Sequence, residues 1–441
     1  MGFSCAWSSG RLWPMVVVGL LGFFAERHAR EVYAQTSRKR EEAAAEGCVV
    51  RDVHSRHFLI HTDLSLDKAH DFVERLEAML GQMSTYWGQP MHGAIECYVI
   101  RNLDEFPVAT IAAAGIRAVK TFGGVTLMEV HKEGKRQVAK SVVYTSSRFE
   151  ILQHEVVHAY CHQTFGRIGP VWYSEGMAEM GRFWKEGNAA IRAEAREIEF
   201  LHNNPPQSLA ETLSSTQVTG DCWQNYASRW ALCHFLASNP NYCHHFRQLG
   251  RGLLAGKDVS FEQTYTAAPR QLFFEYRFFL EHISRGYRVD LCAWDWKKKF
   301  TCLQPKQTQR VTIAAGRGWQ PAGLTARSRT RYEYLAPGTW QIAGGPQAGD
   351  TDGDDRGRGR LVGVLMNDYR LGPEFELGAK GSLLVEAGGD LYLRCRNTWS
   401  ELAGDRGHVT VTFQLQGQCQ ADGKGRADQR ATCDSASCGR Q

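Results

Sequence analysis

The stretch that decides the fold runs HEVVHAYCHQTFGRIGPVWYSEGMAE, from His154 to Glu179. Its first five residues place two histidines four positions apart, and residues four apart lie on the same face of an α-helix. Gly166 and the pair Gly169-Pro170 then interrupt the helical pattern, which predicts that one helix ends, a loop follows and a second helix begins. The stretch therefore predicts a helix–loop–helix unit whose first helix carries both histidines on one face.

The two histidines are expected to hold one metal ion. His154 and His158 would supply two imidazole ligands, and Glu175, 17 residues after His158, would supply a third from the start of the second helix. Two histidines and one carboxylate leave a fourth position for water, which is typical of a catalytic Zn²⁺ site rather than a structural one. Glu155 lies beside the same face and is expected to act as the general base towards that water.

Nearby residues have more than one interpretation. Glu179 lies one turn after Glu175 and would orient a ligating histidine through its second ring nitrogen, which we favour, or be the third ligand itself, or be a solvated helical residue. Tyr226 opens a later helical segment and is the candidate donor to a developing oxyanion, with a packed core position as the alternative. Tyr173 is a weaker candidate for that role. His162 continues the histidine face and is expected to lie outside the ligand set.

Residues 147–180 resemble the gluzincin zinc metallopeptidases of the peptidase-MA-like superfamily. In aminopeptidase-N-like members, a Trp-x-x-Glu-Gly-x-Ala segment follows the His-Glu-x-x-His helix and supplies the third ligand, and Trp172 to Ala178 match it with Glu175 in that position. The likeness is greatest to uncharacterised secreted bacterial relatives and extends over about residues 50–285. It implies a zincin-like catalytic unit that hydrolyses peptide bonds in a protein or peptide substrate. Aminopeptidase activity is not carried over, because no Gly-x-Met-Glu-Asn-type segment is present.

Around this unit the sequence indicates an α+β protein. Residues 48–146 alternate strand-like and helical patterns and are expected to form the α+β N-terminal part of the catalytic unit, and residues 147–303 its helical, zinc-binding part. A capping box, Ser147 followed by Glu150, is predicted to start the histidine helix. From 304 to 416, short strands alternate with Gly, Asp and Pro turns, which is typical of an antiparallel β-sandwich.

The predicted sandwich resembles the galactose-binding, calcium-dependent lectin fold. The stretches that carry the likeness are 357–364 with 375–378, 389–397 and 405–407. That family has an Asn-Asp pair and an Asp-Asn pair where this chain has Asn397-Thr398 and Asp405-Arg406. Two oxygen ligands are therefore missing, and calcium binding is not expected. Glycan binding through this domain is the hypothesis that remains.

The two ends of the chain carry targeting and cysteine signals. Residues 1–34, with Arg11 before an apolar run, are typical of a signal peptide, or of an uncleaved N-terminal anchor, which is the one case in which membrane contact is expected. Either interpretation places the rest of the chain outside the cytoplasm: in the periplasm, at the cell surface or in the medium. Residues 35–47 are a predicted linker. The chain has 13 Cys, three of them in the tail 417–441, which indicates disulfides in an oxidising compartment.

Composition limits the remaining functions. The net charge of +5 is spread along the chain without a dense basic block, so nucleic-acid binding is not expected. The alternative to a peptidase is a non-catalytic secreted or envelope binding protein that uses a zincin scaffold and a lectin-like sandwich. Glu155 between the two histidines favours the enzyme, because a scaffold does not require a general base.

Overall fold

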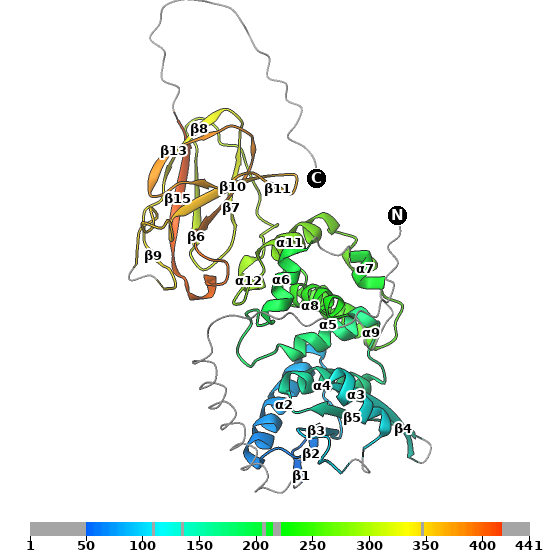
Figure 1. Ribbon diagram of the computed structural model, residues 1–441. Coiled ribbons are helices and arrows are strands. Elements are labelled where there is room, and N and C mark those ends of the chain that lie inside the picture. Colours follow the sequence, from blue (N-terminus) through cyan, green and yellow to red (C-terminus); the bar gives the residue numbers. More distant parts are fainter. Residues whose placement is uncertain are drawn as a thin grey trace, which may run out of the picture.

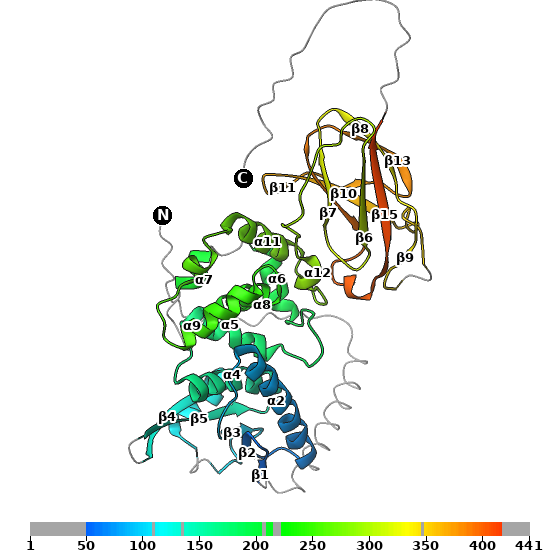
Figure 2. The same cartoon turned by 180° about the vertical axis from the view of Figure 1, so that it is seen from behind.

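The computed structural model describes residues 50–107, 111–133, 136–204, 209–214, 222–344 and 348–416. The predicted signal peptide or anchor, the linker and the cysteine-containing tail lie outside these residues. The predicted α+β class is confirmed: a sheet with its helices lies at one end, antiparallel β-sheets at the other, and a layer of helices between them (Figures 1 and 2). Within the described ranges, no helix is both long and apolar enough to cross a membrane.

A five-stranded mixed sheet begins the described chain. The strand order is β1-β2-β3-β5-β4, with β2, β3 and β5 parallel and the two outer strands antiparallel to their neighbours. The outer strand β4 therefore forms one edge of the sheet. The strands are β1 (Arg51–His54), β2 (Phe58–Thr62), β3 (Ile95–Ile100), β4 (Gly124–Glu133) and β5 (Arg136–Ser146).

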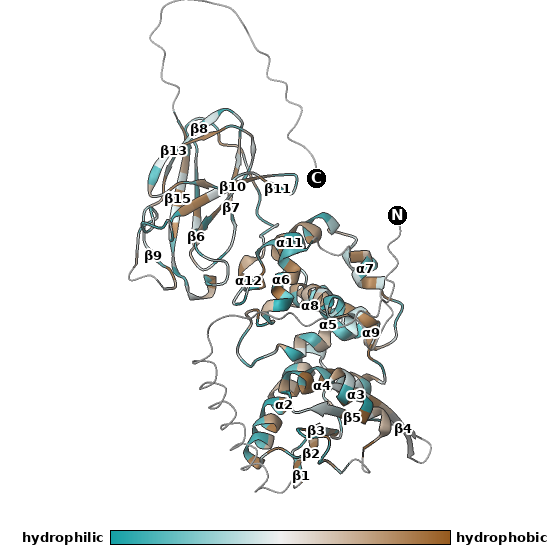
Figure 3. Ribbon diagram, in the orientation of Figure 1, coloured by the Kyte–Doolittle hydropathy of each residue, from teal (hydrophilic) through white to brown (hydrophobic). Residues whose placement is uncertain are grey.

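Helices cover both faces of this sheet. Successive side chains of a strand point to opposite faces, and accordingly Val143 of β5 packs in the main core with α2 (Leu66–Trp87), whereas Val142 packs in a smaller core with α3 (Ala113–Phe122). Hydrophobic and hydrophilic residues both occur along α2, as expected for a helix with one buried face (Figure 3). The histidine helix α4 (Phe149–Phe165) joins α2 in the main core.

The predicted capping box at the start of α4 is wrong. The N-cap residue is Arg148, and no side chain caps the helix. Strand β5 continues to Ser146, so Ser147 lies in the short connection before the helix. Glu150 is then the second helical residue, and the reciprocal bonds of a capping box require the N-cap and the third residue.

The helical layer is built around α5 and α8, which pack against each other. Helix α5 follows the loop predicted from Gly166, Gly169 and Pro170, with Pro170 as its N-cap. The helices of this layer are α5 (Val171–Arg182), α6 (Ala195–Asn203), α7 (Leu209–Ser214), α8 (Trp223–Ser238), α9 (Cys243–Leu254), α10 (Phe261–Tyr265), α11 (Pro269–His282) and α12 (Val289–Cys292).

Two glycines let α5 approach both of its neighbours closely. A Cβ added at Gly176 would lie 2.4 Å from Sγ of Cys233 and 2.7 Å from the backbone oxygen of Arg229, both in α8. A Cβ at Gly181 would lie 2.4 Å from Cγ2 of Val157 in α4. The position of α5 between α4 and α8 therefore depends on the absence of side chains at these two positions.

The C-terminal part consists of two antiparallel sheets that share one core. One sheet has the order β11-β10-β14-β7 with β12 beside β10, and the other has the order β13-β8-β15-β6 with β9 beside β15. Leu393 of the first sheet and Phe413 of the second are fully buried in the common core. The strands are β6 (Thr308–Ala314), β7 (Gln320–Ala326), β8 (Thr330–Leu335), β9 (Trp340–Gln341), β10 (Leu361–Asn367), β11 (Arg370–Leu371), β12 (Phe375–Glu376), β13 (Lys380–Val385), β14 (Gly389–Cys395) and β15 (Arg406–Leu415).

An aromatic cluster joins the helical layer to this β-sandwich. Phe274 and Phe278 of α11 pack with Trp294, and the Trp294 ring lies edge-on to Tyr392 of β14 with 4.6 Å between ring centroids. The predicted domain boundary near residue 304 lies in the segment between α12 and β6. The cysteines in the described part of the chain are free thiols, and the three of the tail lie outside it.

The packing of α5 predicts opposite effects for two helical Gly→Ala substitutions. We expect Gly176→Ala to lower the free energy of unfolding by about 1–3 kcal/mol, because the new methyl group overlaps α8. Gly81 lies on the exposed face of helix α2, and a Cβ added there has nothing within 4 Å. Gly81→Ala should therefore raise the free energy of unfolding by up to about 1 kcal/mol through helix propensity. Urea denaturation followed by circular dichroism measures both. Equal effects of the two changes would contradict the close packing.

Candidate metal centre

Helix α4 brings two imidazoles together. His154 and His158 are one turn apart on the same face, and their Nε2 atoms are 3.2 Å from each other. The rings meet edge to face, with centroids 4.9 Å apart. The two imidazoles therefore lie side by side in the structure, as the four-residue spacing predicts.

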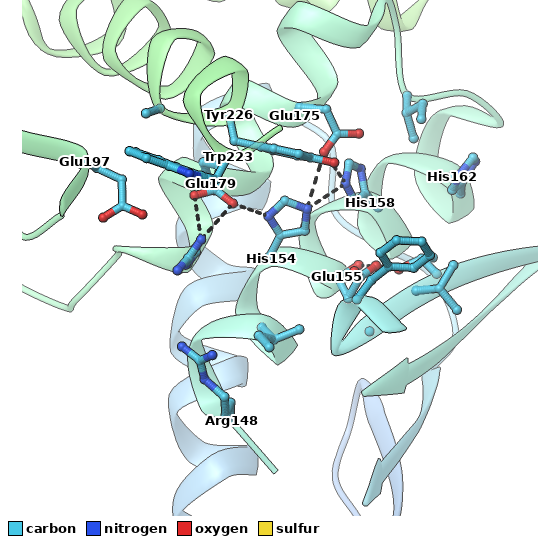
Figure 4. A pocket seen from close by; sticks show the side chains of 18 residues that line it. Arg148, His154, Glu155, His158, His162, Glu175, Glu179, Glu197, Trp223 and Tyr226 are labelled. Atoms are coloured by element: carbon cyan, nitrogen blue, oxygen red, sulfur yellow. Dashed lines mark hydrogen bonds and ion pairs between the residues drawn. The ribbon is translucent and has the colours of Figure 1, made fainter. Parts of the chain in front are cut away.

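Helix α5 adds a carboxylate to the same point. Gly166 ends α4 in a left-handed conformation, with φ of 72°, and turns the chain into the loop that leads to α5. Glu175, on the first turns of α5, then places Oε2 3.4 Å from Nε2 of His154 and 3.4 Å from Nε2 of His158. One nitrogen from each histidine and one oxygen of Glu175 thus converge (Figure 4).

The spacing of the three donor atoms fits a tetrahedral zinc ion. Bonds of about 2.0–2.1 Å at tetrahedral angles put neighbouring ligand atoms about 3.3 Å apart. The three observed separations, 3.2, 3.4 and 3.4 Å, match that value. The donor set, two imidazoles and one carboxylate, is also one that zinc accepts. The residues present therefore fit a zinc ion, which would be held by His154, His158 and Glu175 and would have one coordination position left for water.

The second nitrogen of each imidazole is held by α5. Glu179 Oε1 is 2.9 Å from Nδ1 of His154, and Ser174 Oγ is 3.2 Å from Nδ1 of His158. Glu175 is the carboxylate that faces both Nε2 atoms, which agrees with the interpretation of Glu179 as the residue that orients His154. Ser174 was not among the sequence candidates, because nothing in the order of residues shows which hydroxyl reaches a ring on another helix.

Charge is concentrated around His154. Burial lowers the pKa of His154, but hydrogen bonds to Glu175 and Glu179 outweigh it and raise the pKa to about 10. Burial raises the pKa of Glu175, and the nearby histidines reverse the effect and hold it well below its usual range. The carboxylates are therefore ionised at neutral pH, and a proton and a metal ion compete for the same nitrogen of His154.

Glu155 lies in the wall beside the histidines. It is 8% exposed, and the hydroxyl of Thr126 on β4 lies 2.8 Å from its Oε2 and 2.8 Å from its backbone oxygen. Gly124, also on β4, permits this approach, because a Cβ there would lie 3.1 Å from Cγ of Glu155. Thr126 is a second residue that sequence reasoning missed, since its link to Glu155 depends on how the edge strand packs on α4.

Tyr226 reaches the same site from the first turn of α8. Its ring centroid is 6.2 Å from that of His154, and Figure 4 shows the ring between Trp223 and Glu175. Tyr173, the weaker candidate, is instead fully buried and accepts a hydrogen bond from Nε1 of Trp87 at 2.9 Å, a core position.

An open cavity of about 380 Å³ gives access to these groups. The three donor residues, Glu155, Glu179 and Tyr226 all line it. His162 also lines it but is not one of the three residues whose donor atoms converge. The edge strand β4 contributes the segment from Gly124 to Thr126 to its wall. Glu197 and Trp223 line the cavity as well.

Comparisons with known proteins leave the family open. No family model matches the chain, and no curated protein matches it. One solved structure that resembles part of it is described as "EclA N-terminal domain; PllA-like lectin" and is 12% identical, with a TM-score of 0.19. The match covers 24% of this chain and 96% of that one. A likeness of this size assigns neither a fold nor a ligand to this chain.

The converging donors predict a specific pattern of metal content. We expect about one zinc ion per wild-type chain, and a sharp loss in Glu175→Ala, because two histidines alone rarely retain zinc. Glu155→Gln, which removes a carboxylate from the same cavity without removing a donor, should keep the metal. Plasma mass spectrometry on folded, zinc-reconstituted protein measures all three. A folded wild type without metal would refute the site.

The hydrogen bond behind His154 predicts a smaller effect. In Glu179→Gln we expect zinc affinity to fall about 10- to 100-fold, because the carboxylate no longer orients the ring and raises its basicity. Full occupancy should return at saturating zinc. The matched control is Glu186→Gln, an exposed residue just after α5. Competition with a chromophoric chelator gives the affinities, and equal values for the two variants would contradict the role of Glu179.

Proposed function

We propose that this chain is a gluzincin-type zinc metallopeptidase, with a zincin-like catalytic unit formed by the mixed sheet and the helical layer. The observation that carries the proposal is the convergence of His154, His158 and Glu175 beside Glu155 in one open cavity. A buried carboxylate next to a three-residue metal set is the arrangement of a hydrolytic site, and a structural zinc site would have four protein ligands instead.

Each residue of the site has a defined task in peptide-bond hydrolysis. Zinc bound by the three donors supplies Lewis acidity towards a carbonyl and towards water. Glu155 accepts the proton of the attacking water and delivers it to the leaving nitrogen. Because Thr126 holds one oxygen of Glu155, the other is left for this proton transfer. Tyr226 is the candidate donor to the oxyanion, from its position beside His154.

The edge strand β4 is the surface against which a peptide would bind. Within the described residues β4 pairs with β5 on one side, and its other edge adjoins the cavity wall. An extended peptide can add to such an edge through main-chain hydrogen bonds, which bind backbone irrespective of sequence. A peptide placed this way passes over Thr126 and brings its carbonyl groups next to Glu155.

The alternative, a non-catalytic binding protein, would act through the sandwich. There, the side chain of Asn397 donates to Asp405 at 2.9 Å, and the backbone nitrogen of Ala343 donates to the same carboxylate at 2.7 Å. The groups that resemble a lectin's calcium ligands are thus bonded to one another, which does not favour this function. Glycan binding and a location outside the cytoplasm stay predictions.

The proposal predicts that Glu155→Gln separates catalysis from metal binding. We expect peptide hydrolysis to fall by about 10²- to 10⁴-fold, since the amide cannot accept the water proton, while zinc content stays at wild-type level. Cleavage of a denatured protein mixture, followed by mass spectrometry of new termini, measures activity without a known substrate. Wild-type activity should disappear with a chelator and return with zinc. Equal behaviour of wild type and variant in every assay would favour the binding protein.

A further inference from the structure

Glu197 is a buried carboxylate in the same cavity that the proposed mechanism does not use. It lies on α6, is 3% exposed and lines the cavity on the side opposite His162 in Figure 4. Its Oε1 accepts a hydrogen bond from Nη2 of Arg196 at 2.8 Å. Its Oε2 is buried and has no hydrogen-bond partner among the described residues. A buried carboxylate oxygen without a donor is costly, so a donor from outside the chain is the natural explanation.

An aromatic ring stands beside this carboxylate. Trp223, at the start of α8, lines the cavity, and Phe200 of α6 packs edge-on against it with 5.3 Å between centroids. The guanidinium of Arg196 lies 4.5 Å from the Trp223 ring centroid while it donates to Glu197. Arg196 thus shows that this carboxylate and this indole can together hold a cation. It occupies the Oε1 side of Glu197, so the Oε2 side is the one that can take a further donor.

The charges nearby leave Glu197 short of positive partners. Two other guanidinium groups line the cavity and pair with other carboxylates. Arg182 forms ion pairs with Glu179 at 3.2 Å and with Glu194 at 3.0 Å, and Arg148 lies 4.0 Å from Glu194. Arg196, the ion-pair partner of Glu197, is 52% exposed, so its hold on the carboxylate is weakened by water. Arg148 and Arg182 thus pair with Glu179 and Glu194, and the exposed Arg196 is the one ion-pair partner of Glu197 among the described residues.

We propose that Glu197 and Trp223 form a subsite for a positively charged group of the substrate, an ammonium or a guanidinium. The group is either the free amino terminus of a peptide or the side chain of a Lys or Arg near the cleaved bond. The inference rests on the proposed peptidase function and adds a preference to it: cationic peptides bind more tightly than neutral ones of the same shape. Glu197 binds substrate here and takes no part in proton transfer.

The test measures binding separately from hydrolysis. The probes are three fluorescent pools of degenerate heptapeptides: one acetylated with a central Lys, one acetylated with a central norleucine, and one with norleucine and a free amino terminus. Their affinities are measured by anisotropy on zinc-loaded Glu155→Gln, which holds peptides without cleaving them. We expect one or both cationic pools to bind about 10- to 100-fold more tightly than the acetylated norleucine pool, the size of a hydrogen bond to a charged group. The pool that gains shows which source of positive charge the subsite takes.

Two further variants in that background decide whether Glu197 is responsible. Glu197→Gln keeps the shape and removes the charge, so the preference for cationic pools should disappear while zinc content and the affinity for the neutral pool stay unchanged. Glu199→Gln, an exposed residue on the same helix, removes the same charge outside the cavity and should keep the preference. Equal binding of all three pools, or a preference that survives Glu197→Gln, would overturn the subsite. The binding preference could follow this pattern although the wild type cleaves none of the pools. That result would contradict the proposed peptidase function and still support the cation subsite.

Discussion

Three donor atoms, one each from His154, His158 and Glu175, lie within 3.4 Å of one another, and this is the constraint on which the packing of the helical layer around them depends. Two imidazoles and a carboxylate do not gather at such distances for packing alone, because each loses hydration on burial. The electrostatic arrangement offsets that loss: Glu179 raises the basicity of His154, and the histidines keep Glu175 ionised. The site is therefore prepared for a cation before one binds, which is what a metal centre requires.

The rigidity of this arrangement comes from close helix packing. The histidines share one helix, so their spacing is fixed by helical geometry, whereas Glu175 must be held by the position of α5. Gly181 brings α5 against α4, and Gly176 brings α8 against α5. Glycine is a poor helix former, so the sequence sacrifices local stability at these two positions to obtain a close approach. Gly124 has the same effect on the other side, where β4 reaches Glu155.

A second buried carboxylate fixes the far end of the helical layer. Glu275 on α11 accepts hydrogen bonds from Tyr242, Trp296 and Asn239 at 2.6–2.9 Å and thereby ties α11 to the segment that leads into the sandwich. This junction lies across the helical layer from α4 (Figure 1). Among the described residues, none of the sandwich lines the cavity.

The sequence by itself determined the parts of this protein that depend on local spacing. The four-residue interval of His154 and His158 and the position of Glu175 after two chain breaks all follow from helix periodicity and turn chemistry. The predicted capping box does not form, because strand pairing extends β5 to Ser146 and Ser147 therefore lies outside the helix. Strand β7 contains Pro321 and Gly323, which are typical of a turn, and it forms because pairing with β14 overrides that local preference.

Only the tertiary structure decided which distant groups complete the site. Ser174 against His158 and Thr126 against Glu155 are contacts between residues on different elements, and no periodicity relates such positions. The physical reason is that metal ligands on one helix are spaced by its 3.6-residue repeat, whereas orienting and substrate-binding groups are placed by how helices and strands pack.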